Sequence, residues 1–413
     1  MKHQRYEYEG FGAVDVHEAW TTSEVKAGIE QILTDWAHRL PADAGARIVI
    51  KPNLNNDLVA LVGNCSDLRV LCSIVEGLKN RGYHNIAVAD GSNVGIARRD
   101  IDSLKRLRVS KLKDRYDIDV IDLNRDDGTP VVLHAGARPV IADTVLKADF
   151  LISVPKVKTH CEAGVSCAMK NWVGIARGQK KRHMHYDLAK NIFAINEAVL
   201  PNLVIVDGLI GMEGNGPGDG EPFRFGHLIA SDNAFLNDLV VCRLIDFPWQ
   251  DVGYLVHAAD SGNITEALAE KVWSEVPVIR PIKRAPIRSK LAELSEARSL
   301  HWLKLAVRPA LENPAVLEGA YKLKIIQDVY SREDDTVTGF AKKPGACGQC
   351  RRCEDFCPTH LTAEEIGVKT GEEDCIQCLY CWWVCPKEAI ELHGELNHLE
   401  RQVERYKTII EQI

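Results

Sequence analysis

The cysteines near the carboxyl end are the residues whose spacing most clearly indicates chemistry. The chain has 13 cysteines, and eight of them lie between positions 347 and 385. They form two runs spaced C-x2-C-x2-C-x3-C-P, a pattern typical of bacterial proteins that hold two [4Fe–4S] clusters, in which the fourth cysteine of each run binds the other run's cluster. We therefore predict Cys347, Cys350, Cys353 and Cys385 as ligands of cluster 1, and Cys375, Cys378, Cys381 and Cys357 as ligands of cluster 2.

Structural zinc is the main alternative, because it also takes four thiolates. Zinc ribbons use two cysteines per knuckle, whereas each run here has four cysteines and a trailing proline. The amino-terminal segment MKHQRYEYEG has no apolar core that would mark an export signal, so we expect a reducing compartment and no disulfides. Two [4Fe–4S] clusters are the predicted cofactors, with Phe356, Tyr380, Trp382 and Trp383 shielding them from water.

A second set of polar residues follows short apolar runs of strand length. The run RIVI is followed by Lys51 and Asn53, and the run NIAVA is followed by Asp90 and Ser92. The run FLISV is followed by Lys156, Lys158 and His160. The runs NLVIVD and GHLIAS end in Asp207 and Ser231. In open parallel sheets, ligands bind at the carboxyl ends of the strands, so we expect these residues to converge. The alternative is that Asp-Gly and Ser-Asp are simply turn formers.

The segment from Lys156 to His185 is the most basic part of this region. Together with Lys170 and Asn171 it suits an anionic ligand, a carboxylate or a phosphate, unless it is only a solvated loop. His160, Lys170 and His185 are the candidate catalytic residues. The glycine-rich loop around Gly216 could cradle an anion with its backbone, although a lid or wide hairpin explains it equally well. The predicted ligand-binding residues are Lys51, Asn53, Asp90, Ser92, Lys156, Lys158, Asn171, Asp207 and Gly216.

The elements that must position these residues alternate between strands and helices. Between the apolar runs lie helix-like stretches at 67–79, 101–113 and 187–199. This alternation predicts an α/β fold with an open, mostly parallel sheet and helices on both faces. We expect an α/β domain at 1–279, a basic helical connector at 280–340, a small ferredoxin-like α+β iron–sulfur domain at 341–392 and an amphipathic helix at 393–413.

Charge separates the later segments. Residues 280–324 carry ten Lys and Arg against four Glu, whereas residues 347–391 carry four Lys and Arg against nine Asp and Glu. We expect the connector to lie against the acidic module, with weak association at a membrane surface as the alternative. The tail shows apolar residues spaced three and four apart over too few heptads for a coiled coil, so we expect it to fold back onto the protein, with oligomerisation through it as the alternative.

Composition excludes several classes. At 413 residues, two or three domains are expected. A net charge of -7 argues against a nucleic-acid-binding protein. No apolar run is long enough for a transmembrane helix, so we predict a cytoplasmic protein.

Several of these motifs together resemble the domain-of-unknown-function family 362. They are Lys51-Pro52-Asn53, PKVKTHCEAGVSCAMKNWVG, His185 and VDGLIGMEGNGPGDG, followed by the cysteine module. The resemblance implies an α/β domain coupled to iron–sulfur electron transfer. It singles out Lys51, Asn53, Lys156, Lys158, His160, Lys170, Asn171, Gly174, His185, Asp207 and Gly216.

The functional hypothesis is an iron–sulfur oxidoreductase or electron-transfer protein. Low-potential electrons would pass from a partner protein, through two clusters, to a small anionic molecule at the strand ends. The alternative from another class is a non-catalytic carrier or redox sensor whose α/β domain docks a partner protein.

Overall fold

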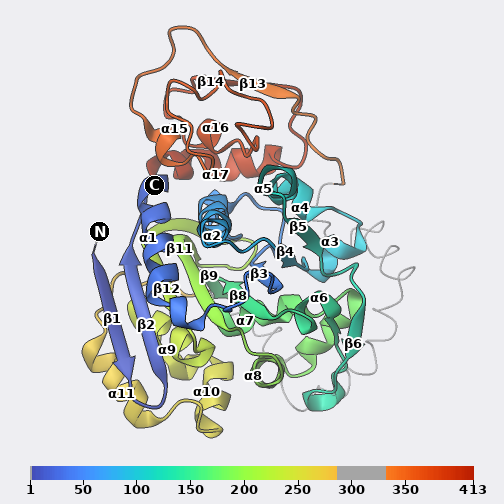
Figure 1. Cartoon of the computed structure of the whole chain (residues 1–413), viewed down its shortest axis with the longest axis vertical. Helices are drawn as coiled ribbons and strands as arrows, with labels where there is room; N and C mark the ends of the chain where they lie inside the picture. Colours follow the sequence, from blue (N-terminus) through green and yellow to red (C-terminus); the bar gives the residue numbers. More distant parts are fainter. Residues whose placement is uncertain (1, 286–331) are drawn as a thin grey trace.

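The computed structural model describes residues 2–285 and 332–413. One sheet of ten strands dominates the chain, in the order β1-β2-β12-β11-β8-β3-β4-β5, with β9 and β10 attached to β11 (Figure 1). Its strands are β1 (His3–Tyr8), β2 (Gly12–Glu18), β3 (Ile48–Pro52), β4 (Ile86–Asp90), β5 (Asp119–Asp122), β8 (Phe150–Val154), β9 (Lys156–His160), β10 (Gly164–Ser166), β11 (Leu203–Glu213) and β12 (Glu221–Ser231). Two small sheets pair β6 (Gly128–Pro130) with β7 (Val140–Ala142) and β13 (Gly339–Lys342) with β14 (Ile390–His393).

The predicted α/β class with an open, mostly parallel sheet is confirmed. Five of the nine pairings in the large sheet are parallel, and they run from β11 through β8, β3 and β4 to β5, with β9 beside β11. The GHLIAS strand was expected among the parallel strands, but β12 is antiparallel to β11. Its end at Ser231 pairs with Val204 and therefore lies at the opposite edge of the sheet from the other strand ends.

Helices cover both faces of the sheet. They are α1 (Thr22–Asp35), α2 (Leu68–Asn80), α3 (Val94–Arg98), α4 (Ser103–Arg106), α5 (Leu112–Tyr116), α6 (Asp143–Leu146), α7 (Ala168–Asn171), α8 (Leu188–Ala198), α9 (Ala234–Leu244), α10 (Gly253–Asp260) and α11 (Glu266–Glu275). The predicted helices at 67–79 and 187–199 correspond to α2 and α8. The stretch at 101–113 is instead broken into short turns, because Arg108 adopts a left-handed conformation with φ of 61°.

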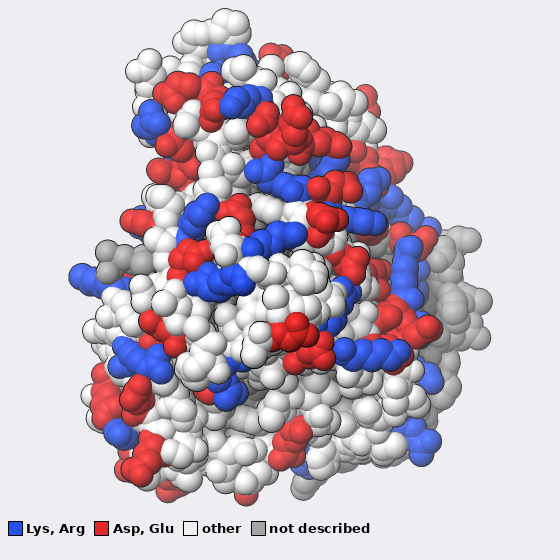
Figure 2. All heavy atoms as spheres, in the orientation of Figure 1, with Lys and Arg blue, Asp and Glu red and all other residues white. Residues whose placement is uncertain are grey.

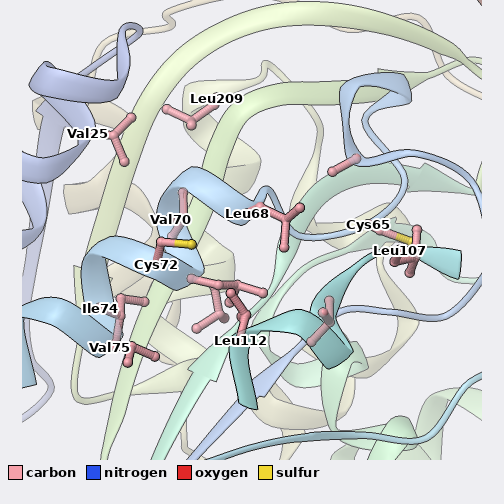
Figure 3. Packing of buried hydrophobic residues seen from close by; sticks show 14 of the residues in the cluster. Val25, Cys65, Leu68, Val70, Cys72, Ile74, Val75, Leu107, Leu112 and Leu209 are labelled. Atoms are coloured by element: carbon pink, nitrogen blue, oxygen red, sulfur yellow. The ribbon is translucent and has the colours of Figure 1, made fainter. Parts of the chain in front are cut away.

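Alternate residues of the central strands enter two separate cores. Ile48 and Ile50 of β3 pack under α1 and α2, whereas Val49 faces the core that contains Trp172 and α8. Figure 3 shows the first of these cores, where the apolar side of α2 (Val70, Ile74) packs against Leu112 of α5. This alternation is what a sheet buried on both faces requires.

The cysteine module packs onto the α1–α2 side and shares its core. It contains α15 (Arg352–Asp355), α16 (Tyr380–Trp383) and the β13–β14 pair, and it is followed by α17 (Glu400–Gln412). Phe356, Tyr380 and Trp383 belong to the same apolar cluster as Ile50 and Leu71. The two parts of the chain therefore share one continuous hydrophobic core. Figure 1 shows the module next to the ends of α1, α2 and α5.

The tail folds back as expected. Tyr406 and Ile410 of α17 are buried, and the Tyr406 hydroxyl donates to the carbonyl oxygen of Gly220 at 3.2 Å. Gln402 bonds the backbone of Val59 and Asp57 at 2.9 and 3.1 Å. The heptad spacing thus serves an internal contact between α17 and the α/β domain.

Salt bridges line the boundary between the acidic module and the α/β domain, where Figure 2 shows mixed charges. Asp334 pairs with Lys105 and Arg106 at 2.9 and 2.8 Å, and Glu372 pairs with Lys111. The basic connector was expected in this place, but most of it (286–331) lies outside the described residues. No helix in the described part of the chain is long and apolar enough to cross a membrane.

Arg69 is the residue on which the docking of the module most depends. It is fully buried, it pairs with Asp67 at 2.7 Å, and its guanidinium lies 4.3 Å from the centre of the Phe356 ring. Because Arg69→Met leaves the buried Asp67 carboxylate unpaired, we expect the free energy of unfolding to fall by about 3–5 kcal/mol. Urea denaturation measures it. Arg125→Met makes the same chemical change at an exposed ion pair and should cost less than about 1 kcal/mol; equal losses would contradict this role for Arg69.

Candidate functional site

A cavity of about 380 Å³ opens at the carboxyl ends of the parallel strands. It lies where β3 and β4 end and where β9 continues the path of β8, between the turn after α7 and the hairpin that joins β11 to β12. The cavity brings together eight of the predicted site residues: Lys51, Asn53, Asp90, Lys158, His160, Lys170, Asn171 and His185.

Lys51 and Asp90 form the floor of the cavity. The Lys51 ammonium donates to Asp90 Oδ1 at 2.5 Å and to Asn171 Oδ1 at 3.2 Å. The other Asp90 oxygen accepts from the backbone N–H of Leu54 at 2.5 Å. Gly174 is required beside them, because a Cβ there would lie 2.6 Å from Lys51 Nζ and 2.7 Å from Asp90 Oδ1.

Lys158 is held on the next wall by two oxygens. Its ammonium donates to Asn53 Oδ1 at 3.0 Å and to the Asn64 carbonyl oxygen at 2.8 Å. The Asn53 amide in turn donates to Asn171 Oδ1 at 3.3 Å, so the two asparagines join the lysine sites into one network. A buried lysine with neutral partners keeps its positive charge available to a ligand.

Lys170, His160 and His185 surround the opening. Lys170 forms no hydrogen bond or ion pair with the part of the chain that the structure describes. His160 Nδ1 accepts backbone N–H bonds from Glu162 and Ala163 at 3.1 and 3.2 Å, so the neutral ring carries its proton on Nε2. His185 Nδ1 lies 3.0 Å from Glu162 Oε2.

The lysines of the cavity have altered acidity. Burial lowers the pKa of Lys158 to about 7, and it lowers the pKa of Lys170 and of Lys181 to about 8. Burial also lowers the pKa of Lys51, although Asp90 opposes the effect. Four ammonium groups with one carboxylate in so small a space favour an anion as the occupant.

Four predicted residues lie outside the lining of the cavity. Lys156 and Asp207 pair with each other at 2.8 Å and are completely buried. Ser92 contributes its carbonyl oxygen to Lys181 at 2.9 Å. Gly216 lies against β9, where a Cβ would be 2.2 Å from the Thr159 carbonyl oxygen, and it brings the neighbouring Pro217 and Gly218 into the lining. A direct ligand contact for these four stays a prediction.

Several lining residues were not among the predicted ones. They are Asn55, Asn56, Gly91, Asn93, Val94, Ser166, Val173, Lys181, Arg182, Pro217 and Gly218, whereas Gly174 was singled out by the family resemblance. Asn55 and Asn56 stand directly after Asn53, and Lys181 and Arg182 belong to the basic segment. The amide-rich sequence NLNN after a strand was the signal that could have identified the first two.

The cysteines predicted for cluster 2 lie together in the module. Cys357, Cys375, Cys378 and Cys381 line one apolar cavity, with Phe340, Leu361 and Ile366 among its other walls. Burial raises the pKa of Cys378, and the neighbouring thiols Cys375, Cys357 and Cys381 raise it further. Four thiols converging on an apolar, shielded space suit a [4Fe–4S] cluster.

The cysteines predicted for cluster 1 are nearer to solvent. Cys347 and Cys350 are exposed, and Cys353 and Cys385 are half-buried. Burial raises the pKa of Cys353 to about 11, and Cys385 and Cys350 are close enough to contribute. Cys385 thus lies near the first run although it belongs to the second, as the predicted exchange of ligands requires.

One cluster 2 cysteine, Cys378, is linked to the lysine-lined cavity through a small cleft. Cys378 and Ser66 line the same small cleft at the boundary between the two parts. Ser66 Oγ accepts from the backbone N–H of Asn53 at 2.8 Å, and the Asn53 side chain lines the larger cavity. The Tyr380 hydroxyl accepts from the Leu68 N–H at 3.2 Å across the same boundary.

Comparisons with known proteins match separate parts of the chain. Residues 48–243 match the model of the domain of unknown function DUF362, and residues 368–391 match that of the 4Fe-4S binding domain. The thylakoid-associated protein sll1697 of Synechocystis is 31% identical over 112 residues, which cover 25% of this chain and 35% of that protein. The lactate racemase apoprotein of Thermoanaerobacterium thermosaccharolyticum aligns with a TM-score of 0.31 and 8% identity over 56% of both chains. The resemblance expected from the motifs is thereby confirmed: one segment of the chain matches the DUF362 model, and a later segment matches the 4Fe-4S binding domain model.

Proposed function

We propose that the protein is an iron–sulfur oxidoreductase that delivers low-potential electrons to a small anionic molecule in the lysine-lined cavity. The electrons would come from a partner protein, pass through two [4Fe–4S] clusters and reduce the bound molecule. When bound, the clusters supply single-electron transfer, and the protein supplies the binding site. A cytoplasmic location remains a prediction.

The observation that carries this proposal is the short connection between Cys378 and Asn53. Ser66 lies in the cleft beside Cys378 and bonds the backbone of Asn53. Cys378 therefore lies at the boundary with the α/β domain, whereas Cys347 and Cys350 are exposed and accessible to a donor protein. A protein that only carried electrons would need no anion site beside its buried ligands.

Within the cavity, one group of residues would bind the anion and another would transfer protons. Lys158, Lys170 and Lys181 provide positive charge for a carboxylate or phosphate group. His160, protonated on Nε2, and His185 beside Glu162 are the candidate proton donors to a molecule that gains electrons.

The exchange of ligands between the two cysteine runs can be tested by paired substitutions. Anaerobically prepared wild-type protein should hold about eight irons per chain. Because Cys357 and Cys378 belong to the same predicted set, Cys357→Ala with Cys378→Ala should leave one intact [4Fe–4S] cluster. Cys357→Ala with Cys350→Ala should leave none. Iron analysis and electron paramagnetic resonance of the reduced protein count the intact clusters.

The opposite result in the two double variants would show that each run binds its own cluster. Cys242→Ala removes a buried cysteine of the α/β core and should keep both clusters. A colourless protein that contains zinc would contradict the iron–sulfur assignment itself.

Anion binding should weaken as the pH rises through 7 to 8. The charged form of Lys158 is lost near pH 7 and those of Lys170 and Lys181 near pH 8, so the cavity holds most positive charge below these values. Isothermal titration with inorganic phosphate and with malonate at pH 6.5 and 9.0 measures the difference, which we expect to exceed about tenfold. Lys170→Met should remove most of the affinity at pH 6.5, whereas Lys113→Met, at an exposed position, should not. Affinity that does not depend on pH would contradict the role of these lysines.

Electron delivery separates the enzyme from the carrier. Protein reduced with dithionite is mixed with candidate anionic acceptors, and reoxidation of the clusters is followed by absorbance. Lys170→Ala and His185→Ala should slow reoxidation by these acceptors at least tenfold, while reoxidation by ferricyanide, which does not need the cavity, stays unchanged. If both variants reduce every anionic acceptor at the wild-type rate with intact clusters, the protein is a carrier or a sensor.

A further inference from the structure

Two histidines and two aspartates meet under the carboxyl end of α1, in a part of the chain that the cavity and the cysteine module do not use. They are His3 of β1, Asp15 and His17 of β2, and Asp35, the last residue of α1. One possible ligand atom of each residue lies within 4.8 Å of the others. We propose that these four side chains bind one divalent transition-metal ion of the zinc type.

The position of the cluster in the sheet is unusual for polar residues. Val14 and Val16 of β2 enter the core beneath α9, so Asp15 and His17 point to the opposite face, toward α1. Asp15 and His17 are both completely buried. Burying a carboxylate and an imidazole together costs free energy unless each finds a partner.

Three of the candidate ligand atoms have no partner among the described residues. Both ring nitrogens of His17 are buried without a hydrogen bond, and so is Asp35 Oδ2. The other Asp35 oxygen accepts from Gln31 at 2.8 Å, which fixes the carboxylate. Buried polar atoms are almost always paired in native proteins, and a metal ion would supply the missing partner for His17 and for Asp35.

Hydrogen bonds from neighbouring side chains fix the orientation of the Asp15 carboxylate. Its Oδ2 accepts from Trp36 Nε1 at 2.7 Å and from Arg5 at 2.8 Å. Its Oδ1 lies 2.8 Å from His3 Nε2 and is the atom available to an ion. Arg5 also pairs with Glu7 at 2.7 Å, so its charge is balanced outside the site.

The ligand types favour zinc over magnesium or calcium. The rings of His3 and His17 stack with centroids 4.1 Å apart. Two imidazoles and two carboxylates suit a borderline ion, and the carboxylates neutralise its charge. Tetrahedral bonds of about 2.0 Å place ligand atoms about 3.3 Å apart, so the His3 and His17 rings, which stack within 5° of parallel, would turn about their side-chain bonds to direct a nitrogen at the ion.

The ion would act as a structural clip. β1 is an edge strand that pairs only with β2 in the large sheet, and α1 packs on the face of β2 that carries Asp15 and His17. One ion bound to His3, Asp15, His17 and Asp35 would tie β1, β2 and α1 together.

Zinc titration calorimetry on the full chain, purified without oxygen and with its clusters loaded, tests the proposal. We expect one zinc ion per chain with micromolar or tighter affinity, and a rise in the melting temperature. His17→Gln and Asp35→Asn should each weaken this binding by at least about 100-fold, because loss of a ligand exceeds the effect of losing an outer partner. His38→Gln is the matched control, since His38 is exposed and lies next to Trp36 but outside the four.

Zinc captured by cysteines that lack a cluster would persist in His17→Gln and can be subtracted. If His17→Gln does not fold, as judged by circular dichroism and cluster absorbance, the zinc affinity of Asp35→Asn tests the proposal instead, because Asp35 is only half-buried. The proposal is overturned if the wild-type chain binds no zinc below millimolar concentration, or if both ligand variants bind it as tightly as the wild type.

Discussion

A buried set of four charges fixes how the main parts of the molecule fit together. Asp67 caps the amino end of α2 and pairs with Arg69, while its backbone N–H donates to Asp207 of β11 at 2.6 Å. Asp207 pairs with Lys156 of β9, and all four side chains are excluded from solvent. Arg69 continues the set into the module by lying over the Phe356 ring. Such a set is tolerable only when every member is paired, so helix, strands and module must keep one relative position.

This constraint also explains why polar residues of a single strand have different roles. Lys156, Lys158 and His160 lie on the same side of β9, because side chains two residues apart share a face. Lys156 is used by the buried pair with Asp207, whereas Lys158 and His160, farther along, line the cavity. The paired lysine sets the register of β9 against β11, and that register positions the next lysine over Asn53.

The sequence predicted the convergence of the polar strand ends better than it predicted the sheet around them. Apolar runs ending in Lys51, Asp90 and Lys156 were recognisable locally, and parallel strands must bring their ends together. The local pattern of residues does not show the direction of a strand, so the direction of β12 was predicted wrongly. The length of the connection did contain this information, because the few residues between β11 and β12 are too short for a parallel crossover. The β1–β2 hairpin was missed because its first strand, HQRYEY, is polar throughout. Pairing also escaped prediction: nothing local distinguishes the cavity lysine Lys158 from the buried partner Lys156.

The shared core has a consequence for the electron transfer that we propose. A ferredoxin domain on a flexible tether must find its acceptor by diffusion, and the transfer distance then varies. Here Cys357, Cys381 and Tyr380 belong to the same apolar cluster as Ile50 and Val154, the strand residues just before the cavity. Close-packed cores do not slide continuously, so cluster ligands and lysines are held at one separation. This fixed separation restricts the motion of the module relative to the α/β domain. It is useful when the electrons have a fixed destination within the same chain.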